Sequence, residues 1–144
     1  PSRVVILSSA SHWTGELDWD DLQLATPGAY DALRAYDQSK LAVLMLTLAL
    51  ARRLEGSGVG AVCLDPGDVA TTMLAAGWPD LPGIRVEDGA VTSVYLASAP
   101  DVEGLSGVYF EDGAAVTPLA AALQVDAQER LWAEVEAVAG PLGL

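Results

Sequence analysis

The stretch Ala35–Leu54, AYDQSKLAVLMLTLALARRL, is followed after Gly56–Gly58 by the apolar run Val59–Leu64, VGAVCL. The first segment has strong helix formers and no internal glycine or proline, so it predicts a long helix that ends at the glycines. The second segment is short and continuously apolar, which is typical of a parallel strand covered on both faces. Together they predict a helix that leads into a buried strand.

Two further apolar runs flank this pair, Val4–Leu7 before it and Gly107–Phe110 after it. A second helical pattern covers Glu87–Ala97 and is stopped by Pro100, and a third runs over about residues 126–138. Alternation of strands and helices predicts right-handed parallel crossovers. We therefore expect an α/β fold, a doubly wound (Rossmann-like) sheet of three parallel strands with flanking helices.

Some local features of these elements are also predicted. Asp126 and Glu129 have the spacing of a capping box at the start of the last helix, and Leu131, Val135 and Val138 form one apolar face. The connection 10–33 is long for a structureless loop, so short helical structure is expected around residues 20–24.

The first helix is apolar on several faces, which predicts burial on more than one side. Either more of the same chain or a second subunit covers it. In a chain of 144 residues, we favour a subunit interface and hence a homo-oligomer, such as a dimer.

Composition limits the function classes. A hydrophobic content of 51% predicts a folded protein, and a net charge of −13 with seven basic residues argues against a nucleic-acid partner. The stretch Leu41–Ala51 is too short to span a bilayer, and Pro1–Arg3 leads directly into a strand pattern without a signal peptide, so no membrane partner is expected. The single cysteine, Cys63, predicts core packing in a reducing, cytoplasmic compartment. No metal site is expected.

One half of a nucleotide-binding fold is missing from the pattern. A sheet that starts with Val4–Leu7 has an uncovered edge, and such sheets are built from two mononucleotide-binding halves. The nearest glycine cluster, 56–60, follows a helix and enters a strand, so it is a helix stop and no dinucleotide fingerprint. Residues 1–144 are therefore predicted to be a single partial domain that lacks its N-terminal dinucleotide-binding half.

Polar residues follow the predicted strands at one edge of the sheet. Ser9 ends the first strand, Tyr36 and Lys40 lie in the opening turns of the helix that follows, and Pro66–Gly67 ends the second strand. Ligands bind outside the carboxyl ends of strands in such sheets. Tyrosine has an ordinary pKa of about 10, and a neighbouring ammonium four residues along a helix favours its phenolate. A serine hydroxyl opposite it stabilises charge that develops on a substrate oxygen.

Each feature also has an ordinary structural explanation. A Tyr and a Lys four residues apart are more often a surface pair, paired serines after a strand are commonly a cap, and Pro-Gly is usually a turn. Their joint placement at one edge favours acid–base chemistry on an alcohol or a carbonyl.

These motifs resemble those of the short-chain dehydrogenases/reductases over essentially the whole chain. Tyr36–Lys40 resembles the Tyr-x-x-x-Lys signature, Val5–Ala10 resembles the strand with the catalytic serine, and Asp65–Thr71 is similar to the Pro-Gly-x-x-x-Thr segment that lines the nicotinamide. The insertion Leu17–Leu22 and the tail from Gly107 onward are most similar to the retinol-dehydrogenase-like branch.

The resemblance implies roles for individual residues. Tyr36 would be the general acid/base, Lys40 would lower its pKa and bind the nicotinamide ribose, and Ser9 would orient the substrate oxygen. The cofactor, NAD or NADP, would be contacted by Tyr36, Lys40, Pro66, Gly67, Val69 and Thr71. The phosphate-binding half would have to come from elsewhere, so the partners implied are a small alcohol or carbonyl substrate and a complementing N-terminal half.

Other positions depart from the family or are weaker candidates. Asp65 stands where relatives commonly have His or Asn, and the family's helix-borne asparagine has no counterpart. His12 and Trp13 are possible substrate contacts, although a lone loop histidine is more often on the surface. Tyr30 has Arg34 rather than lysine four residues on. The segment 73–85 is either a loop that closes over substrate, as in the family, or an ordinary connection.

Two functions therefore stay open. The first is the catalytic half of an NAD(P)-dependent oxidoreductase. The second is a non-catalytic Rossmann-like fragment that serves as an interaction or dimerisation module, which the absent phosphate site and the apolar helix favour.

Overall fold

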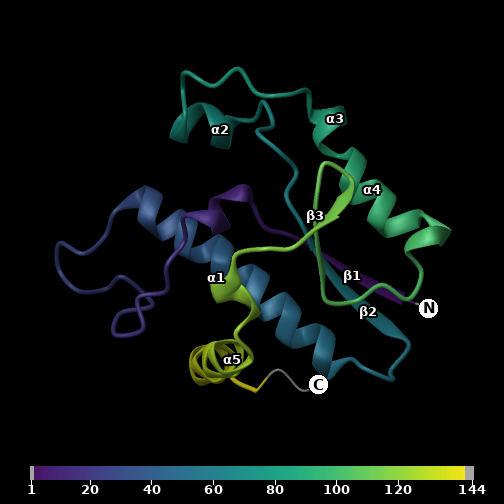
Figure 1. Ribbon diagram of the computed structural model, residues 1–144. Helices are drawn as coiled ribbons and strands as arrows, with labels where there is room; N and C mark the ends of the chain where they lie inside the picture. Colours follow the sequence, from purple (N-terminus) through teal and green to yellow (C-terminus); the bar gives the residue numbers. More distant parts are fainter. Residues whose placement is uncertain (1, 142–144) are drawn as a thin grey trace.

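The computed structural model describes residues 2–141, and within them the strands form one sheet in the order β1-β2-β3-β4 (Figure 1). The elements, in chain order, are β1 (Ser2–Leu7), η1 (Ala10–Trp13), α1 (Ala32–Arg53), β2 (Val59–Leu64), α2 (Thr72–Gly77), α3 (Val86–Gly89), α4 (Val91–Ser98), η2 (Pro100–Val102), β3 (Val108–Glu111), β4 (Ala114–Val116), η3 (Ala120–Leu123) and α5 (Val125–Ala139). The three predicted strands are present and parallel, and the α/β fold is confirmed.

A fourth strand was not predicted. β4 runs antiparallel to β3 after the dipeptide Asp112-Gly113, whose φ values are 48° and 74°. An Asp-Gly pair with two positive φ angles favours a tight hairpin turn. This turn signal is present in the sequence, but the strand that follows it has only three residues.

The helices cover both faces of the sheet. The row Ile6, Cys63 and Tyr109 packs with α1 and α5, and the neighbouring row, which includes Val62, packs with Leu96 of α4. Because β1, β2 and β3 are parallel and in sequence order, helices on opposite faces give the two crossovers opposite hands. The prediction of right-handed crossovers throughout is therefore wrong for one of them. The connection 65–85 carries the chain from the end of β2 to α3 and α4 on that other face.

The predicted burial of the first helix on several sides is confirmed, and the cover comes from the chain itself. Leu41, Leu44 and Met45 are at most 2% exposed, between the sheet on one side and α5 on the other (Figure 1). At the end of α1, Arg52 and Arg53 both pair with Glu129 of α5. Internal cover therefore explains the apolar helix without a second subunit, and a homo-oligomer stays a prediction.

Two helix details differ from the prediction. The segment 87–97 is divided at Ala90 into α3 and α4, where Gly89 packs so closely on Val69 that a Cβ would collide with its side chain. The capping box at Asp126 is wrong, because Gln124 precedes the first turn of α5 without a side-chain cap and Glu129 binds the arginines instead. Of the predicted apolar face of α5, Leu131 and Val135 join the core, whereas Val138 is 73% exposed.

The expected helical structure around residues 20–24 is also absent there. The chain forms turns instead, and the Asp21 carboxylate accepts hydrogen bonds of 2.8 Å from the N–H groups of Ala25 and Thr26. These bonds lower the pKa of Asp21. A carboxylate that satisfies backbone donors in this way stabilises a turn in place of a helix.

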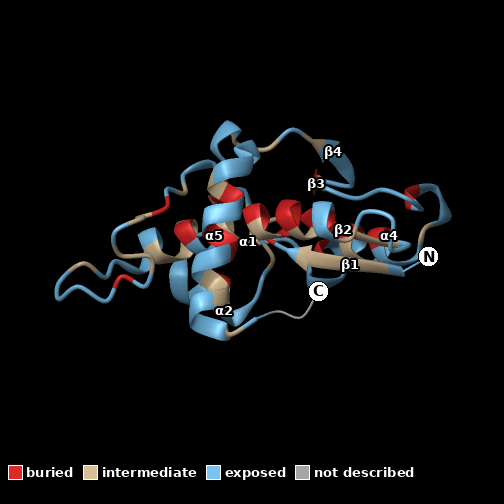
Figure 2. Cartoon of the chain, turned by 90° about the horizontal axis from the view of Figure 1, so that it is seen from below, coloured by how far each residue is buried: buried red, intermediate tan, exposed pale blue. Residues whose placement is uncertain are grey.

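β1 is the open edge of the sheet. It pairs only with β2 within the described residues, and most of it is half-buried despite its apolar sequence (Figure 2). Leu7 is 49% exposed, whereas its register partner Leu64 on β2 is fully buried. The predicted uncovered edge is thus confirmed. Among the described helices, none has the length and apolarity needed to cross a membrane.

Candidate active site

A hollow of about 740 Å³ opens at the carboxyl edge of the sheet. Its wall includes Ser9 after β1, Tyr36 on α1 and the segment Asp65–Val69 after β2. Chain order predicted that these groups would meet at one edge, and they do.

The two serines after β1 have different environments. The Ser8 hydroxyl is 2% exposed and donates a hydrogen bond of 2.8 Å to the Lys40 carbonyl, which ties the end of β1 to α1. Ser9 is the N-cap of η1, and its Oγ accepts from the Ser11 N–H at 3.2 Å. The Ser9 hydroxyl proton therefore has no role in the cap and can point to a ligand in the hollow.

Tyr36 lies in the second turn of α1. The helix begins after Asp31, whose carboxylate accepts from the Arg34 N–H at 2.8 Å. The Nζ atom of Lys40 lies 5.4 Å from the centre of the Tyr36 ring. Lys40 does not itself line the hollow, so its charge acts on the pocket through its position beside the tyrosine.

The segment after β2 lines the hollow with backbone and small side chains. Pro66, Gly67, Val69 and Thr71 all belong to the wall, and Gly67 has a φ of 77°. The Thr71 Oγ1 accepts from the Leu74 N–H at 3.3 Å and so caps α2. The Thr71 hydroxyl proton stays available to a ligand.

Asp65 brings an acidic group to the same wall. Its burial raises the pKa of the carboxyl, while the nearby amides of Ala10 and Gly67 lower it and the charge of Glu111 raises it further. The side chain is thus partly desolvated next to Ser9, in a position where the resemblance leads one to expect His or Asn.

Much of the wall was not predicted, and no motif marks it. Its apolar part comes from the start of α1 and from residues 70–84, which we call the flap. Further polar members of the wall are Thr14, Asp37 and Ser93. The apolar members outside the predicted motifs include Leu33, Met73, Leu74, Trp78 and Leu81.

The flap contains α2 and is closed at its base, so the alternative of an irregular connection is wrong in part. Ile84 donates to the Asp68 carbonyl at 2.7 Å and accepts from the Ala70 N–H at 2.8 Å. Gly83 has a φ of 66°, and a Cβ there would lie 2.6 Å from the Ala70 nitrogen. The far end of the flap places the Trp78 ring edge-on to Tyr36, with ring centres 5.4 Å apart.

The weaker candidates lie outside the hollow. His12 is 0% exposed, so it is neither a surface residue nor a substrate contact. Trp13 donates its indole N–H to Glu111 at 2.9 Å, and Tyr30 is 70% exposed beside a different depression.

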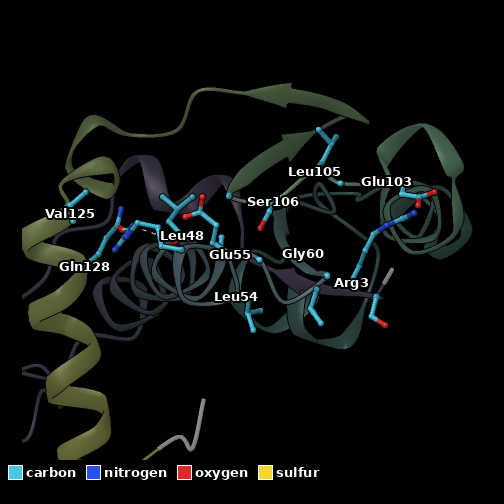
Figure 3. Close-up of a pocket in the computed structure, with 18 of the residues that line it drawn as sticks. Arg3, Leu48, Leu54, Glu55, Gly60, Glu103, Leu105, Ser106, Val125 and Gln128 are labelled. Atoms are coloured by element: carbon cyan, nitrogen blue, oxygen red, sulfur yellow. Dashed lines mark hydrogen bonds between the residues drawn. The ribbon is translucent and has the colours of Figure 1, made fainter.

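A hollow of similar size lies at the opposite edge of the sheet, between the starts of the strands and the end of α1 (Figure 3). Its two arginines are occupied: Arg3 donates to the carbonyls of Leu96 and Ala99, and Arg52 binds Gln128 and Glu129. None of the predicted site residues lines this second hollow, whereas Ser9, Tyr36 and the segment after β2 line the hollow at the carboxyl edge.

No family model matches the chain. Individual proteins do. The chain is 41% identical over 145 residues to polyprenol dehydrogenase of Mus musculus, covering 92% of this chain and 43% of that protein. It is 35% identical over 156 residues to retinol dehydrogenase 14 of Homo sapiens, covering 99% and 45%. The chain thus spans less than half the length of these curated relatives.

Solved structures agree on the fold. A crystal structure of an uncharacterized protein from Mycobacterium paratuberculosis superposes with a TM-score of 0.74 at 30% identity, over 94% of this chain and 49% of that one. A short-chain dehydrogenase from Salmonella enterica superposes with a TM-score of 0.56 at 18% identity, over 78% and 41%. In both, the matched part is about half of a larger fold.

Proposed function

Because this chain belongs to the short-chain dehydrogenase/reductase family, we propose that it is the catalytic half of an NAD(P)-dependent oxidoreductase that interconverts an alcohol and a carbonyl. One observation carries the proposal: Ser9, Tyr36 and the segment 65–71 line one hollow, and Lys40 lies beside the tyrosine ring.

Tyr36 is the general acid/base in this proposal. In reduction it gives its phenolic proton to the carbonyl oxygen, and in oxidation it takes the proton of the substrate hydroxyl. Lys40 stabilises the phenolate by its charge, and Ser9 donates a hydrogen bond to the reacting oxygen. A bound nicotinamide supplies or accepts the hydride at the substrate carbon.

The residues present fit one end of a dinucleotide. The free hydroxyl protons of Ser9 and Thr71 and the backbone of the Pro66–Val69 turn suit a polar carboxamide and a ribose, with Lys40 as a cation nearby. The described residues contain no helix start behind a glycine-rich turn after a strand, which is the usual site of the pyrophosphate. We therefore infer that the phosphates bind a second polypeptide segment, which also decides between NAD and NADP.

The open edge of β1 supports this partner. Within residues 2–141, its half-buried apolar residues have no neighbouring strand on one side, and a strand from a dinucleotide-binding half would both cover them and continue the sheet. The chain is in this sense a single partial domain, and the complete fold would join it with the missing half.

The substrate is proposed to be apolar. The apolar part of the wall includes Leu33, Met73, Trp78 and Leu81, which suit a hydrocarbon chain next to the reacting oxygen. A cytoplasmic location is proposed from Cys63, which is buried and has its pKa raised to about 11 by desolvation, so that it suits a reducing compartment without reacting there.

The test is reconstitution. The chain would be co-expressed with the N-terminal half of mouse polyprenol dehydrogenase, and this pair, the reconstituted enzyme, would be assayed with NADH and NADPH against long-chain aldehydes. Turnover that disappears in Tyr36→Phe, with nucleotide binding unchanged, is the expected result. Normal turnover by Tyr36→Phe contradicts the catalytic assignment. A stable pair that binds nucleotide but has no turnover favours the second candidate, an interaction module, which the open β1 edge also suits.

A further inference from the structure

His12 is the single histidine of the chain, and its fully buried side chain contacts the backbone of Ser9. Its Nδ1 is 2.8 Å from the Ser9 carbonyl oxygen, and its Nε2 is 3.5 Å from the Leu119 nitrogen. A backbone N–H only donates and a carbonyl only accepts, so Nε2 accepts from Leu119 and Nδ1 carries the proton. The surroundings thus select the neutral Nδ1–H tautomer.

The imidazole also connects the turn after β1 to β3. It packs on Trp13 with ring centres 4.5 Å apart, and edge-on to Tyr109 of β3 at 4.7 Å. Tyr109 is 1% exposed, so this contact is made in the core. His12 therefore ties the catalytic edge to the C-terminal part of the chain, with Leu119 lying 107 positions away in the sequence.

The same turn is fixed from its other side by α1. A Cβ on Gly15 would lie 2.6 Å from the Asp37 carbonyl oxygen and 2.9 Å from the Leu41 Cβ. The Thr14 hydroxyl donates to the Asp37 carboxylate at 2.9 Å, and Asp37 directly follows Tyr36. η1 is thus held on one side by the contact of its own His12 with β3 and on the other, through Thr14 and Gly15, by the helical turn with the proposed general acid/base.

We propose that His12 is a positioning residue that holds the Ser9 carbonyl through its Nδ1–H group and thereby sets the Ser9 hydroxyl against Tyr36. The imidazole takes no part in proton transfer, because it does not line the hollow. This inference rests on the roles proposed above for Ser9 and Tyr36.

The first test uses variants of the reconstituted enzyme. His12→Phe keeps a ring against Trp13 and Tyr109 and the backbone N–H bond to the Ser9 carbonyl at 3.1 Å, but it removes the side-chain donor. We expect kcat to fall about tenfold to a hundredfold with KM for the nucleotide unchanged. His12→Asn restores a donor near the Nδ1 position, and most of the kcat should return. Leu131→Ala, at a buried site of α5 away from Ser9, is the stability control. A loss of kcat in His12→Asn as large as that in His12→Phe would overturn the proposal. So would an equal loss of kcat in Leu131→Ala and His12→Phe when the two variants have the same thermal stability.

The second test needs no turnover. Labelling only this chain with ¹⁵N-histidine and mixing it with the unlabelled N-terminal half gives one imidazole spectrum. A single slowly exchanging Nδ1–H tautomer is expected, and an Nε2–H tautomer or an average of both overturns the proposal. If the spectrum is as expected but Tyr36→Phe is active, the proposed function fails while the His12–Ser9 link stands. If Tyr36→Phe is inactive and the tautomer differs, only the His12 inference fails.

Discussion

The indole of Trp78 lies edge-on to the phenol ring of Tyr36, with ring centres 5.4 Å apart and planes at 67°. Trp78 ends α2 in the flap, and its N–H donates to the Leu74 carbonyl at 2.7 Å. The flap therefore contributes an aromatic wall directly beside the proposed general acid/base.

Removing this wall should change catalysis more than stability. An aromatic pair of this geometry is worth about 0.5–1.5 kcal/mol, so Trp78→Ala is expected to lower kcat/KM for long-chain aldehydes in the reconstituted enzyme by up to about tenfold. Trp78→Phe should retain most of the activity. Trp19→Ala, outside the hollow and stacked against Arg130, is the matched control. Equal effects of the two alanine variants on kcat/KM would mean that the ring contact only packs the flap.

The cation beside Tyr36 gives a second prediction. Lys40→Met keeps the aliphatic stem but removes the charge 5.4 Å from the ring centre, and general acid–base assistance contributes about 10²–10⁴-fold to such reactions. We expect kcat/KM to fall by at least about a hundredfold. Arg34→Met removes a cation from the first turn of the same helix, where it pairs with Asp18 outside the hollow. A similar loss in both variants would attribute the effect to general charge and not to Lys40.

Gly15 gives a prediction about the fit of η1 on α1. Gly15→Ala forces a methyl group to within 2.6 Å of the Asp37 carbonyl oxygen, and overpacking of this kind costs about 1–3 kcal/mol. The free energy of unfolding, measured with urea, should fall by that amount. Gly77→Ala is the control, since a Cβ there meets no atom within 4 Å. Equal stability of the two variants would show that the turn shifts away from the helix without cost.

The contact between α1 and α5 predicts an acid-sensitive contribution to stability. Hydrogen bonds to Arg53 and Arg52 lower the pKa of Glu129 from 4.5 to about 2. A depressed carboxyl pKa stabilises the fold above the unfolded-state value and loses this effect as the pH falls towards 2. The pair is 45% exposed on the Glu129 side, so solvent screening limits its worth to about 1 kcal/mol.

Glu129→Gln tests this contribution. The variant should be less stable than the wild type at pH 7 and should approach it between pH 4.5 and pH 2, the window of the shifted pKa. Glu134→Gln, on the same helix without an ion pair to either arginine, should follow the wild-type pH curve. A constant difference between Glu129→Gln and the wild type over that window would assign the loss to packing.

Sequence periodicity and chain order predicted the strands and the edge at which the proposed site residues meet, because both depend on local pattern. Ser9, Tyr36 and Pro66–Gly67 meet because parallel strands present their carboxyl ends together. α4 lies on the face of the sheet opposite to α1. The long connection that precedes α4 has no periodicity, so no local pattern in the sequence indicates which face α4 covers. His12 is buried by Tyr109 and Leu119, which are distant in the sequence. Because the residues next to His12 do not reveal these contacts, the sequence alone favoured a surface position for this histidine.

The flap has a consequence for redesign of the pocket. Residues 65–85, which include the flap, line much of the hollow and also connect the end of β2 to the helices on the face of the sheet opposite α1. A shorter transplanted loop would have to make this connection and keep the bonds between Ile84 and residues 68 and 70 that close the base of the flap. Selectivity is therefore open to engineering by side-chain exchange at Met73, Trp78 and Leu81, whereas loop length is constrained by topology.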